Sequence, residues 1–257
     1  MASEPNTRAD VPVKATRVSF DVVETLQELD GAGVTEVAEH LGLPRSTAHD
    51  HLRTLEELEL VVNEDGTYRA GTRFLEFGGY VRRGMKVFEV AKPELKKLAE
   101  QTGEHTNLMV EEHGRGVFLY KTEGENAVKL DTYNGYRVPL QTTALGKAIM
   151  AHMPEERVRD ILERHGMPAV TDRTVTDEDV LFEQLEEVRE RGYAVDVEER
   201  VLGMRCIAAP ILNDSEVLGA ISVSGPKNRM QGDRFEEEIP SQVLRTANVI
   251  EVNLTYM

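Results

Sequence analysis

Residues 41–58, LGLPRSTAHDHLRTLEEL, determine the predicted fold of the first third of the chain. Gly42 ends a short apolar segment, and Pro44 suits the first turn of the helix that follows. The predicted buried stripe of that helix consists of Ala48, Leu52, Leu55 and Leu58. Polar and basic side chains crowd its first turns, a pattern typical of a helix that reads double-stranded DNA.

The segments on either side complete a DNA-binding module. Residues 17–33 predict a helix that buries either Phe20 and Val23 or Val22 and Leu29, with Leu26 common to both faces. A second short helix follows, with Thr35 as its predicted N-cap. Residues 60–71 predict a β-hairpin around an Asp-Gly turn. Three helices and a hairpin within residues 15–71 indicate a winged helix-turn-helix.

The candidate DNA-binding residues lie on the third helix and on the wing. They are Arg45, Ser46, Thr47, His49, His51 and Arg53 on the helix, with Tyr68 and Arg69 on the wing. Arg45 can fork onto a guanine or hold a phosphate. The Ser46 and Thr47 hydroxyls, close to the helix start, can bind phosphate oxygens or bases. Asp50 is unusual among them: it can accept a bond from a cytosine amino group, or pair with Arg53.

The charge of the chain is unusual for a DNA-binding protein. Its 257 residues include 46 acidic and 30 basic ones, a net charge of −16, and residues 1–84 alone hold fifteen acids against nine bases. The acids are spread along a chain with only nine lysines, which suits the surface of a protein in a high-salt cytoplasm. An ordinary acidic soluble protein is the alternative. Either way, operator affinity should depend only weakly on salt.

Other features bound the location of the protein. No stretch of 18 apolar residues is present, so no membrane association is expected. Residues 1–14 lack an apolar core and are predicted to form a disordered tail rather than a secretory signal. The single cysteine, Cys206, excludes an internal disulfide. We therefore expect a cytoplasmic protein.

The rest of the chain has a different pattern. Residues 72–84 predict a linker helix, and residues 85–257 predict helices flanking a mainly antiparallel sheet. Strands are expected in the segments 105–123, 127–133, 193–199, 205–212 and 217–226, and a final helix over 233–255. The fold class is α+β.

Four blocks in fixed order carry a resemblance to a known family. They are GLPRSTAHDHLRTL, TTALGKAIMAHMP, RGYAVDVEERVLGMRCIAAPI and GAISVSGP. The chain resembles the IclR-type transcriptional regulators, and its acidic composition indicates a member from a halophilic archaeon. The resemblance implies a GAF-like effector-binding domain over 85–257 and assembly as a homodimer or tetramer.

The resemblance also implies an effector site. Residue-by-residue matching gives Ala144, Leu145, Asp196, Cys206, Ser222 and Ser224. Ser222 and Ser224 are two residues apart on one predicted strand, so their hydroxyls share a face. This set suits a small polar metabolite, a hydroxy acid or a sugar derivative. Leu145, where the family more often has a smaller residue, would reshape the pocket. Buried serines, a core cysteine and a turn aspartate are the structural alternatives.

Enzymatic and metal-binding functions are not expected. Nothing near Cys206 in the sequence activates a nucleophile, and no nucleophile elbow, phosphate loop or dinucleotide fingerprint is present. His105 and His113 flank a strand and do not share a helical face, so zinc spacing is absent. We expect no catalytic residues, no metal and no cofactor.

The sequence thus predicts an effector-controlled, sequence-specific regulator, activator or repressor, of catabolic genes, with sugar or sugar-acid metabolism the favoured pathway. Two alternatives remain. One is a constitutive or architectural DNA binder whose second domain serves only for oligomerisation. The other is a ligand-responsive module that no longer binds DNA.

Overall fold

A computed structural model describes residues 11–130, 132–214 and 216–256. The chain divides into two compact units, residues 1–81 and 82–257, and each is described by itself. The predicted tail, residues 1–14, lies mostly outside the described residues. The first helix, α1, begins at Lys14, the last residue of the predicted tail.

The first unit is a three-helix module with a hairpin wing. Its elements are α1 (Lys14–Glu28), α2 (Val34–Leu41), α3 (Arg45–Glu57), β1 (Val61–Glu64) and β2 (Thr67–Ala70). On α1 the inner face contains Val22 and Leu26, whereas Phe20 is 60% exposed, so the second of the two predicted faces is closer to the structure. Ala48, Leu52 and Leu55 of α3 pack against it in one core.

The start of α2 differs from the sequence prediction. Gly33, not Thr35, occupies the N-cap position, and the helix begins at Val34. The Glu36 carboxylate accepts a hydrogen bond from the Gly33 N–H at 2.8 Å, as in the acidic half of a capping box. Thr35 is thereby free to contact α3. Gly42 ends the helix in the left-handed conformation, as predicted (φ 63°).

The wing is the predicted two-residue hairpin. Asp65 and Gly66 both have positive φ, 52° and 89°, which is the geometry of a type I′ turn. An isolated bridge joins Ala32, between α1 and α2, to Tyr68 on β2. This bridge attaches the wing to the helices.

Helix α4 (Arg73–Arg83) follows the wing and contains the boundary between the two units. The Arg73 guanidinium donates to the Leu58 carbonyl at the end of α3. None of the residues of α4 is buried, and Leu75 and Tyr80 are each 75% exposed. No described helix is long and apolar enough to cross a membrane.

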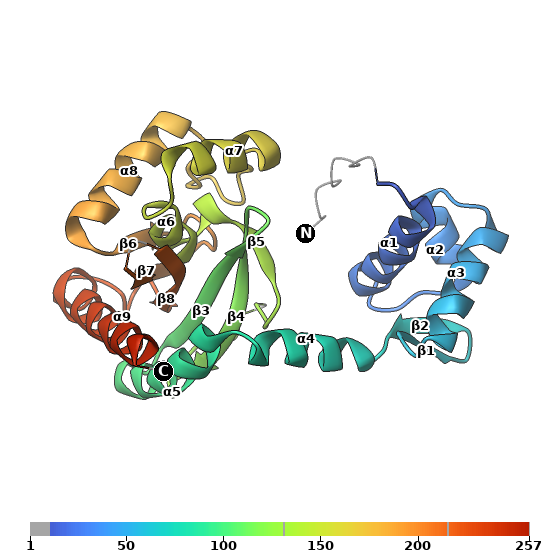
Figure 1. The fold of residues 1–257 in the computed structure, drawn as a ribbon, viewed down its shortest axis with the longest axis horizontal. Helices are drawn as coiled ribbons and strands as arrows, with labels where there is room; N and C mark the ends of the chain where they lie inside the picture. Colours follow the sequence, from blue (N-terminus) through green and yellow to red (C-terminus); the bar gives the residue numbers. More distant parts are fainter. Residues whose placement is uncertain (1–10, 131, 215, 257) are drawn as a thin grey trace. The chain divides into compact units, whose positions relative to one another are not determined.

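The second unit is built on one antiparallel sheet (Figure 1). Its strands are β3 (His105–Glu112), β4 (Arg115–Glu123), β5 (Arg137–Pro139), β6 (Ala194–Val197), β7 (Met204–Asn213) and β8 (Glu216–Pro226). Their order across the sheet is β5-β4-β3-β8-β7-β6. The helices are α5 (Lys86–Thr102), α6 (Ala144–Met150), α7 (Glu155–His165), α8 (Glu178–Arg191) and α9 (Ile239–Thr255). The predicted α+β class with a mainly antiparallel sheet is confirmed.

Each face of the sheet has its own core. On one face Leu108, Ile207 and Val223 pack with residues of α5 and α9, which lie together in Figure 1. On the other face, Met109 and Ala208 pack with residues of α6, α7 and α8. Because side chains alternate along a strand, the odd positions of β3 and the even positions of β6, β7 and β8 share this second face.

Two predicted elements differ from the structure. The strand expected over residues 127–133 is absent from the described part of that segment, which is irregular, and the edge strand is β5 instead. The final helix begins with a π-helical turn, Arg234–Glu238, before α9. The strand that pairs with β4 is β5, through residues 115–117 of β4, and not the segment 127–133.

Candidate functional site

Helix α3 presents most of the predicted DNA-binding side chains to solvent. Arg45, Ser46, His49 and Arg53 are exposed, and Thr47 is half-buried. Arg45 donates a hydrogen bond of 2.6 Å to the Thr35 hydroxyl on α2. This contact holds the guanidinium at the N-terminal end of α3, where a recognition helix meets base edges.

An open groove of about 620 Å³ lies between α3 and the wing. It is lined by His49, Arg53, Glu56, Glu57, Glu59 and Tyr68. Three of these six side chains are acidic, so the surface of the groove has little net positive charge. A basic side chain there can attract a DNA phosphate only at close range. The Asp50 carboxylate lies 3.6 Å from the His49 Nδ1, whereas the sequence analysis offered a cytosine amino group or Arg53 as its partner.

Three predicted DNA contacts have other partners in the structure. His51 is half-buried, and its Nδ1 lies 2.9 Å from the Ser19 hydroxyl of α1. Tyr68 is only 6% exposed and belongs to the core of the first unit, so only its edge along the groove can meet DNA. Arg69 is exposed on the wing and pairs with Glu64 at 3.2 Å.

In the second unit the predicted effector residues converge on the face of the sheet covered by α6, α7 and α8. The strand register places Ser224 opposite Cys206, and Cys206 opposite Asp196. His105 continues this row on β3. Ser222 lies one pleat further along β8, opposite Asn107. We call these six side chains the polar row: His105, Asn107, Asp196, Cys206, Ser222 and Ser224.

Hydrogen bonds connect the middle of the polar row. The Asn107 side-chain amide donates to the Ser222 hydroxyl at 3.1 Å and reaches the Ser224 hydroxyl at 3.4 Å. The Ser224 hydroxyl donates to the Cys206 sulfur at 3.1 Å. At the β3 end, the His105 Nε2 contacts the Val128 carbonyl of the irregular segment, while its buried Nδ1 has no hydrogen-bond partner among the described residues. The row therefore offers both hydroxyl and amide groups to a ligand.

Asp196 closes the other end of the row. Its Oδ1 accepts a 2.7 Å hydrogen bond from the Glu199 N–H, as the turn aspartate of the structural alternative would. Burial and repulsion by Glu199 raise its pKa to about 7, although Lys147 and the turn N–H groups oppose the rise. Near neutral pH the Asp196 carboxyl is therefore populated in both forms, and it can donate to a ligand as well as accept.

Cys206 is a buried thiol and not a thiolate. Burial, followed by the nearby Asp196, raises its pKa to about 12, and hydrogen bonds with Ser224 and Ser222 only partly offset this. A nucleophilic cysteine needs a lowered pKa. The thiol therefore forms a compact, weakly polar wall.

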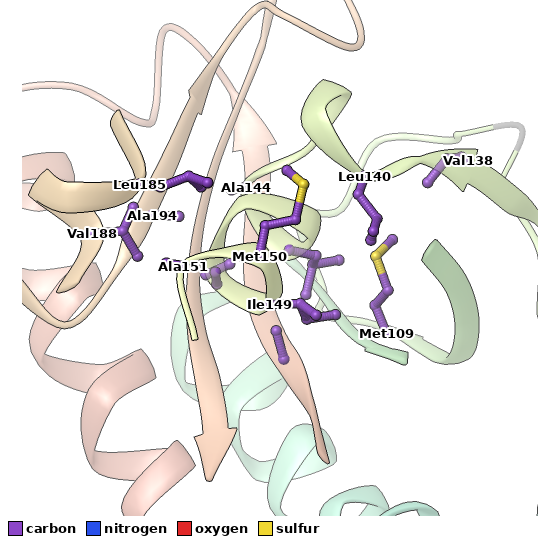
Figure 2. Close-up of a cluster of buried hydrophobic side chains, with 14 of the residues drawn as sticks. Met109, Val138, Leu140, Ala144, Ile149, Met150, Ala151, Leu185, Val188 and Ala194 are labelled. Atoms are coloured by element: carbon purple, nitrogen blue, oxygen red, sulfur yellow. The ribbon is translucent and has the colours of Figure 1, made fainter. Parts of the chain in front are cut away.

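Ala144 and Leu145 begin α6 and are buried in the apolar cluster that also contains Cys206. Figure 2 shows Ala144 among the other side chains of this cluster. The Thr143 hydroxyl accepts a hydrogen bond from the Gly146 N–H at 2.9 Å, so the protein itself caps one of the N–H groups at the start of α6. A Cβ at Gly146 would lie 2.0 Å from the Leu140 carbonyl oxygen. This close approach requires glycine, and it fixes the position of the α6 N-terminus.

A buried ion pair joins α6 to the turn that follows β6. Lys147 of α6 is 2% exposed, and its Nζ donates to the Glu199 Oε1 at 2.7 Å and to the Gln184 side chain at 3.2 Å. The pair attaches α6 to the turn that binds Asp196. Its position is consistent with a supporting role for the polar row.

The sequence prediction missed several residues around the row. Asn107 carried a usable signal, because HTN places two polar side chains on one face of a strand otherwise rich in apolar residues. Lys147 carried the weaker signal of a lysine within an apolar helix. Arg200 lay in an acidic run, and nothing in the local pattern indicated its surroundings.

Comparison with known proteins identifies both units. The family model described as "IclR helix-turn-helix domain" matches residues 15–65, and the model described as "Bacterial transcriptional regulator IclR C-terminal" matches residues 80–252. The chain belongs to the IclR family of transcriptional regulators. The resemblance drawn from the four sequence blocks is therefore confirmed.

Relatives of this IclR-family chain support the assignment along nearly its whole length. It is 34% identical over 241 residues to the probable HTH-type transcriptional regulator ArcR of Halobacterium salinarum, covering 92% of each chain. It is 32% identical over 250 residues to the transcriptional repressor IclR of Escherichia coli, covering 95% of this chain and 90% of the relative. These relatives are regulators, so the family member described here is a regulator and not an enzyme.

Solved structures agree with the fold. The Thermotoga maritima IclR structure has a TM-score of 0.74 at 30% identity, and the alignment covers 95% of this chain and 98% of that one. An IclR homologue from Microbacterium hydrocarbonoxydans, complexed with 4-hydroxybenzoate, has a TM-score of 0.79 at 25% identity, covering 95% of this chain and 100% of that one.

Among the described residues, no three His, Cys, Asp or Glu side chains gather as a metal site.

Proposed function

We propose that this IclR-family regulator binds a small hydroxylated metabolite, a hydroxy acid or a sugar derivative, on the polar row. The observation that carries the proposal is the register of the row: hydroxyl, thiol, amide and carboxyl groups from four neighbouring strands converge on one buried face. Buried polar groups are normally hydrogen-bonded to a partner. A few polar groups that converge on an otherwise apolar surface are typical of a small-molecule site. The effector residues are Ala144, Leu145, Asp196, Cys206, Ser222 and Ser224.

The DNA-binding part of the proposal rests on α3 and the wing. Arg45, Ser46, Thr47, His49 and Arg53 read an operator, with Arg69 on the phosphate backbone. His51, which Ser19 positions, and the edge of Tyr68, which lines the groove, add further contacts. Residues 15–71 form the DNA-binding domain, residues 72–84 the linker helix and residues 85–257 the effector-binding domain.

Effector binding changes operator affinity by a population shift between two arrangements of the domains. The working form is a homodimer or tetramer in the cytoplasm, adapted to high salt by its acidic surface. The regulated genes are catabolic and belong to sugar or sugar-acid metabolism. The names of relatives such as the transcriptional repressor IclR and the HTH-type transcriptional repressor AllR of Escherichia coli favour repression.

A thermal-shift screen of hydroxy acids and sugar derivatives tests the effector assignment. A true effector raises the melting temperature of the wild type and has a much smaller effect on Ser222→Val, because this variant removes a hydroxyl that the row offers to the ligand. If no compound distinguishes the two proteins, the second domain serves only for oligomerisation and the constitutive DNA binder is the better account.

A further inference from the structure

One cation near the polar row, Arg200, forms no ion pair with a carboxylate in the part of the chain that the structure describes. Arg200 follows the turn after β6, and its guanidinium carbon lies 5.6 Å from the centroid of the Phe118 ring and 5.3 Å from that of Tyr136. Phe118 is buried in the apolar cluster that contains Cys206, and Tyr136 packs against the same cluster. The two rings therefore hold the guanidinium beside the row.

The charge of Arg200 is poorly compensated. Burial lowers its pKa, and the groups that oppose this are the Tyr136 hydroxyl, Asp196 and Cys206. Arginine nevertheless stays protonated in proteins. Lys147 forms an ion pair with Glu199 at 2.7 Å. Arg200 forms no ion pair with any carboxylate within residues 11–130, 132–214 and 216–256. A partly buried cation without an anion costs free energy, which a bound anion would recover.

The groups around Arg200 explain why a nearby acid does not neutralise it. The carboxyl group that opposes the fall in the pKa of Arg200 is that of Asp196. The Oδ1 of this carboxyl already accepts a hydrogen bond from the Glu199 N–H. Glu199 itself faces Lys147. Tyr136 contributes a hydroxyl and a ring face, both neutral. The anion that matches Arg200 must therefore come from outside these residues.

The chemistry of the guanidinium selects the kind of anion. Its N–H donors lie in its own plane, where they match the two oxygens of a carboxylate, while its faces remain available to aromatic rings. Two rings already contact the group, which reduces the freedom it would lose on binding. An arginine held in this way is organised for a planar carboxylate.

We propose that Arg200 binds the carboxylate of the effector and so restricts the effector to hydroxylated carboxylic acids. This inference rests on the proposed function and narrows it, since it removes neutral sugar derivatives from the ligand class. The carboxylate pairs with Arg200 between Phe118 and Tyr136, and the hydroxyl end reaches Ser222, Ser224 and Cys206. A neutral ligand leaves the guanidinium unpaired and binds more weakly.

The test compares carboxylates with their neutral amides on the full-length protein. The probes are benzoate and 4-hydroxybenzoate against benzamide and 4-hydroxybenzamide, each titrated to tens of millimolar at constant ionic strength. The readout is the side-chain Nε–Hε NMR signal of Arg200, assigned by its loss in Arg200→Gln. We expect the carboxylates to shift this signal and the amides to leave it in place. Arg200→Gln should weaken carboxylate binding at least about tenfold, with Arg200→Lys intermediate.

The matched control is Arg157→Gln, which removes the same charge from an exposed guanidinium paired with Glu111 at 3.2 Å. It should bind the carboxylates as the wild type does. The proposal is overturned if no carboxylate shifts the Arg200 signal, if amides and carboxylates bind equally, or if Arg200→Gln and Arg157→Gln behave alike.

Ser222→Val separates this inference from the proposed function. If it weakens 4-hydroxybenzoate binding while Arg200→Gln does not, the polar row holds the ligand and Arg200 has no part in it. If Arg200→Gln weakens binding while Ser222→Val does not, Arg200 is an anion site and the assignment of the row is wrong. Weaker binding in both variants supports both.

Discussion

Asp196 and Cys206 lie directly opposite each other on β6 and β7, and burial raises the pKa of both. Near neutral pH the Cys206 thiol is protonated and the Asp196 carboxyl is populated in both forms, so the pair can donate and accept hydrogen bonds. Because the pKa of Asp196 differs between the folded and unfolded protein, the free energy of unfolding should depend on pH.

The first prediction concerns this linkage. The pKa of Asp196 rises from 3.8 to about 7 on folding. The folded protein therefore binds the extra proton between these values, and the destabilising effect of Asp196 is absent below about pH 4, grows up to about pH 7 and is constant above it. At about 1.4 kcal/mol per unit, Asp196→Asn should gain at most about 4 kcal/mol over the wild type across this interval.

Urea unfolding at fixed salt from pH 4 to pH 8 measures this difference. Asp172→Asn, which alters an exposed acid of the same unit, is the control and should follow the wild type. A difference between Asp196→Asn and the wild type that does not change with pH would show that Asp196 titrates normally.

The second prediction concerns the buried ion pair. Lys147→Met leaves Glu199 buried without its cation and should destabilise the protein by about 3 kcal/mol. The double variant Lys147→Met/Glu199→Leu removes both charges and should recover most of that loss, because replacing a whole buried pair by apolar residues is often neutral. Denaturant unfolding of the three proteins and of Glu199→Leu gives the coupling free energy. A single-variant loss below about 1 kcal/mol would mean that solvent reaches the pair.

The third prediction concerns Arg45. Arg45→Ala should reduce operator affinity by about 1–3 kcal/mol, relax specificity at one base position, and change stability by less than about 0.5 kcal/mol, since the side chain is exposed. Footprinting on operators selected from a random DNA pool measures the first two effects. Thr35→Ala, which removes only the hydroxyl that positions Arg45, should lose less affinity. Equal losses in both variants would indicate that Arg45 acts by holding α2 to α3 and makes no base contact.

The fourth prediction concerns salt. The groove between α3 and the wing is lined by three acids beside its cations, and residues 1–84 carry a net charge of −6 from nine bases and fifteen acids. Counterion release should therefore contribute little, and affinity should fall only slowly, or even rise, as salt increases. Plotting log affinity against log salt for a selected operator measures this. A slope of about −6 or steeper, as for a protein with many phosphate contacts, contradicts the account.

The sequence predicted what depends on local pattern. Helical spacing correctly gave Ala48, Leu52 and Leu55 as the inner face of α3, and the Asp65-Gly66 pair gave the wing, because both are determined within a few residues. Leu58, the fourth predicted residue of that face, is 50% exposed because the helix ends at Glu57. The alternation in β8 correctly put Ser222 and Ser224 on one face. Family resemblance, and not spacing, brought Asp196 and Cys206 into the same site.

What the sequence did not predict depends on long-range contacts. Tyr68 was expected to contact DNA from the wing, but it lies beside Ala32 in the bridge between β2 and the helices, and its ring belongs to the core. His51 contacts Ser19, which lies 32 residues earlier. The segment 127–133 has strand-like composition, but β5 is the strand that pairs with β4. Phe118 and Tyr136 lie beside Arg200 only in the folded chain, because they are far from it in sequence.

The most direct test of the central claim is operator binding with and without a carboxylate effector found in the thermal-shift screen, measured by fluorescence anisotropy in the wild type and in Ser222→Val. The account predicts that the effector changes wild-type operator affinity by about 5- to 150-fold and that Ser222→Val largely loses this change while it binds operator normally without effector. An effector that binds the wild type but leaves its operator affinity unchanged, or that shifts both proteins equally, would contradict it.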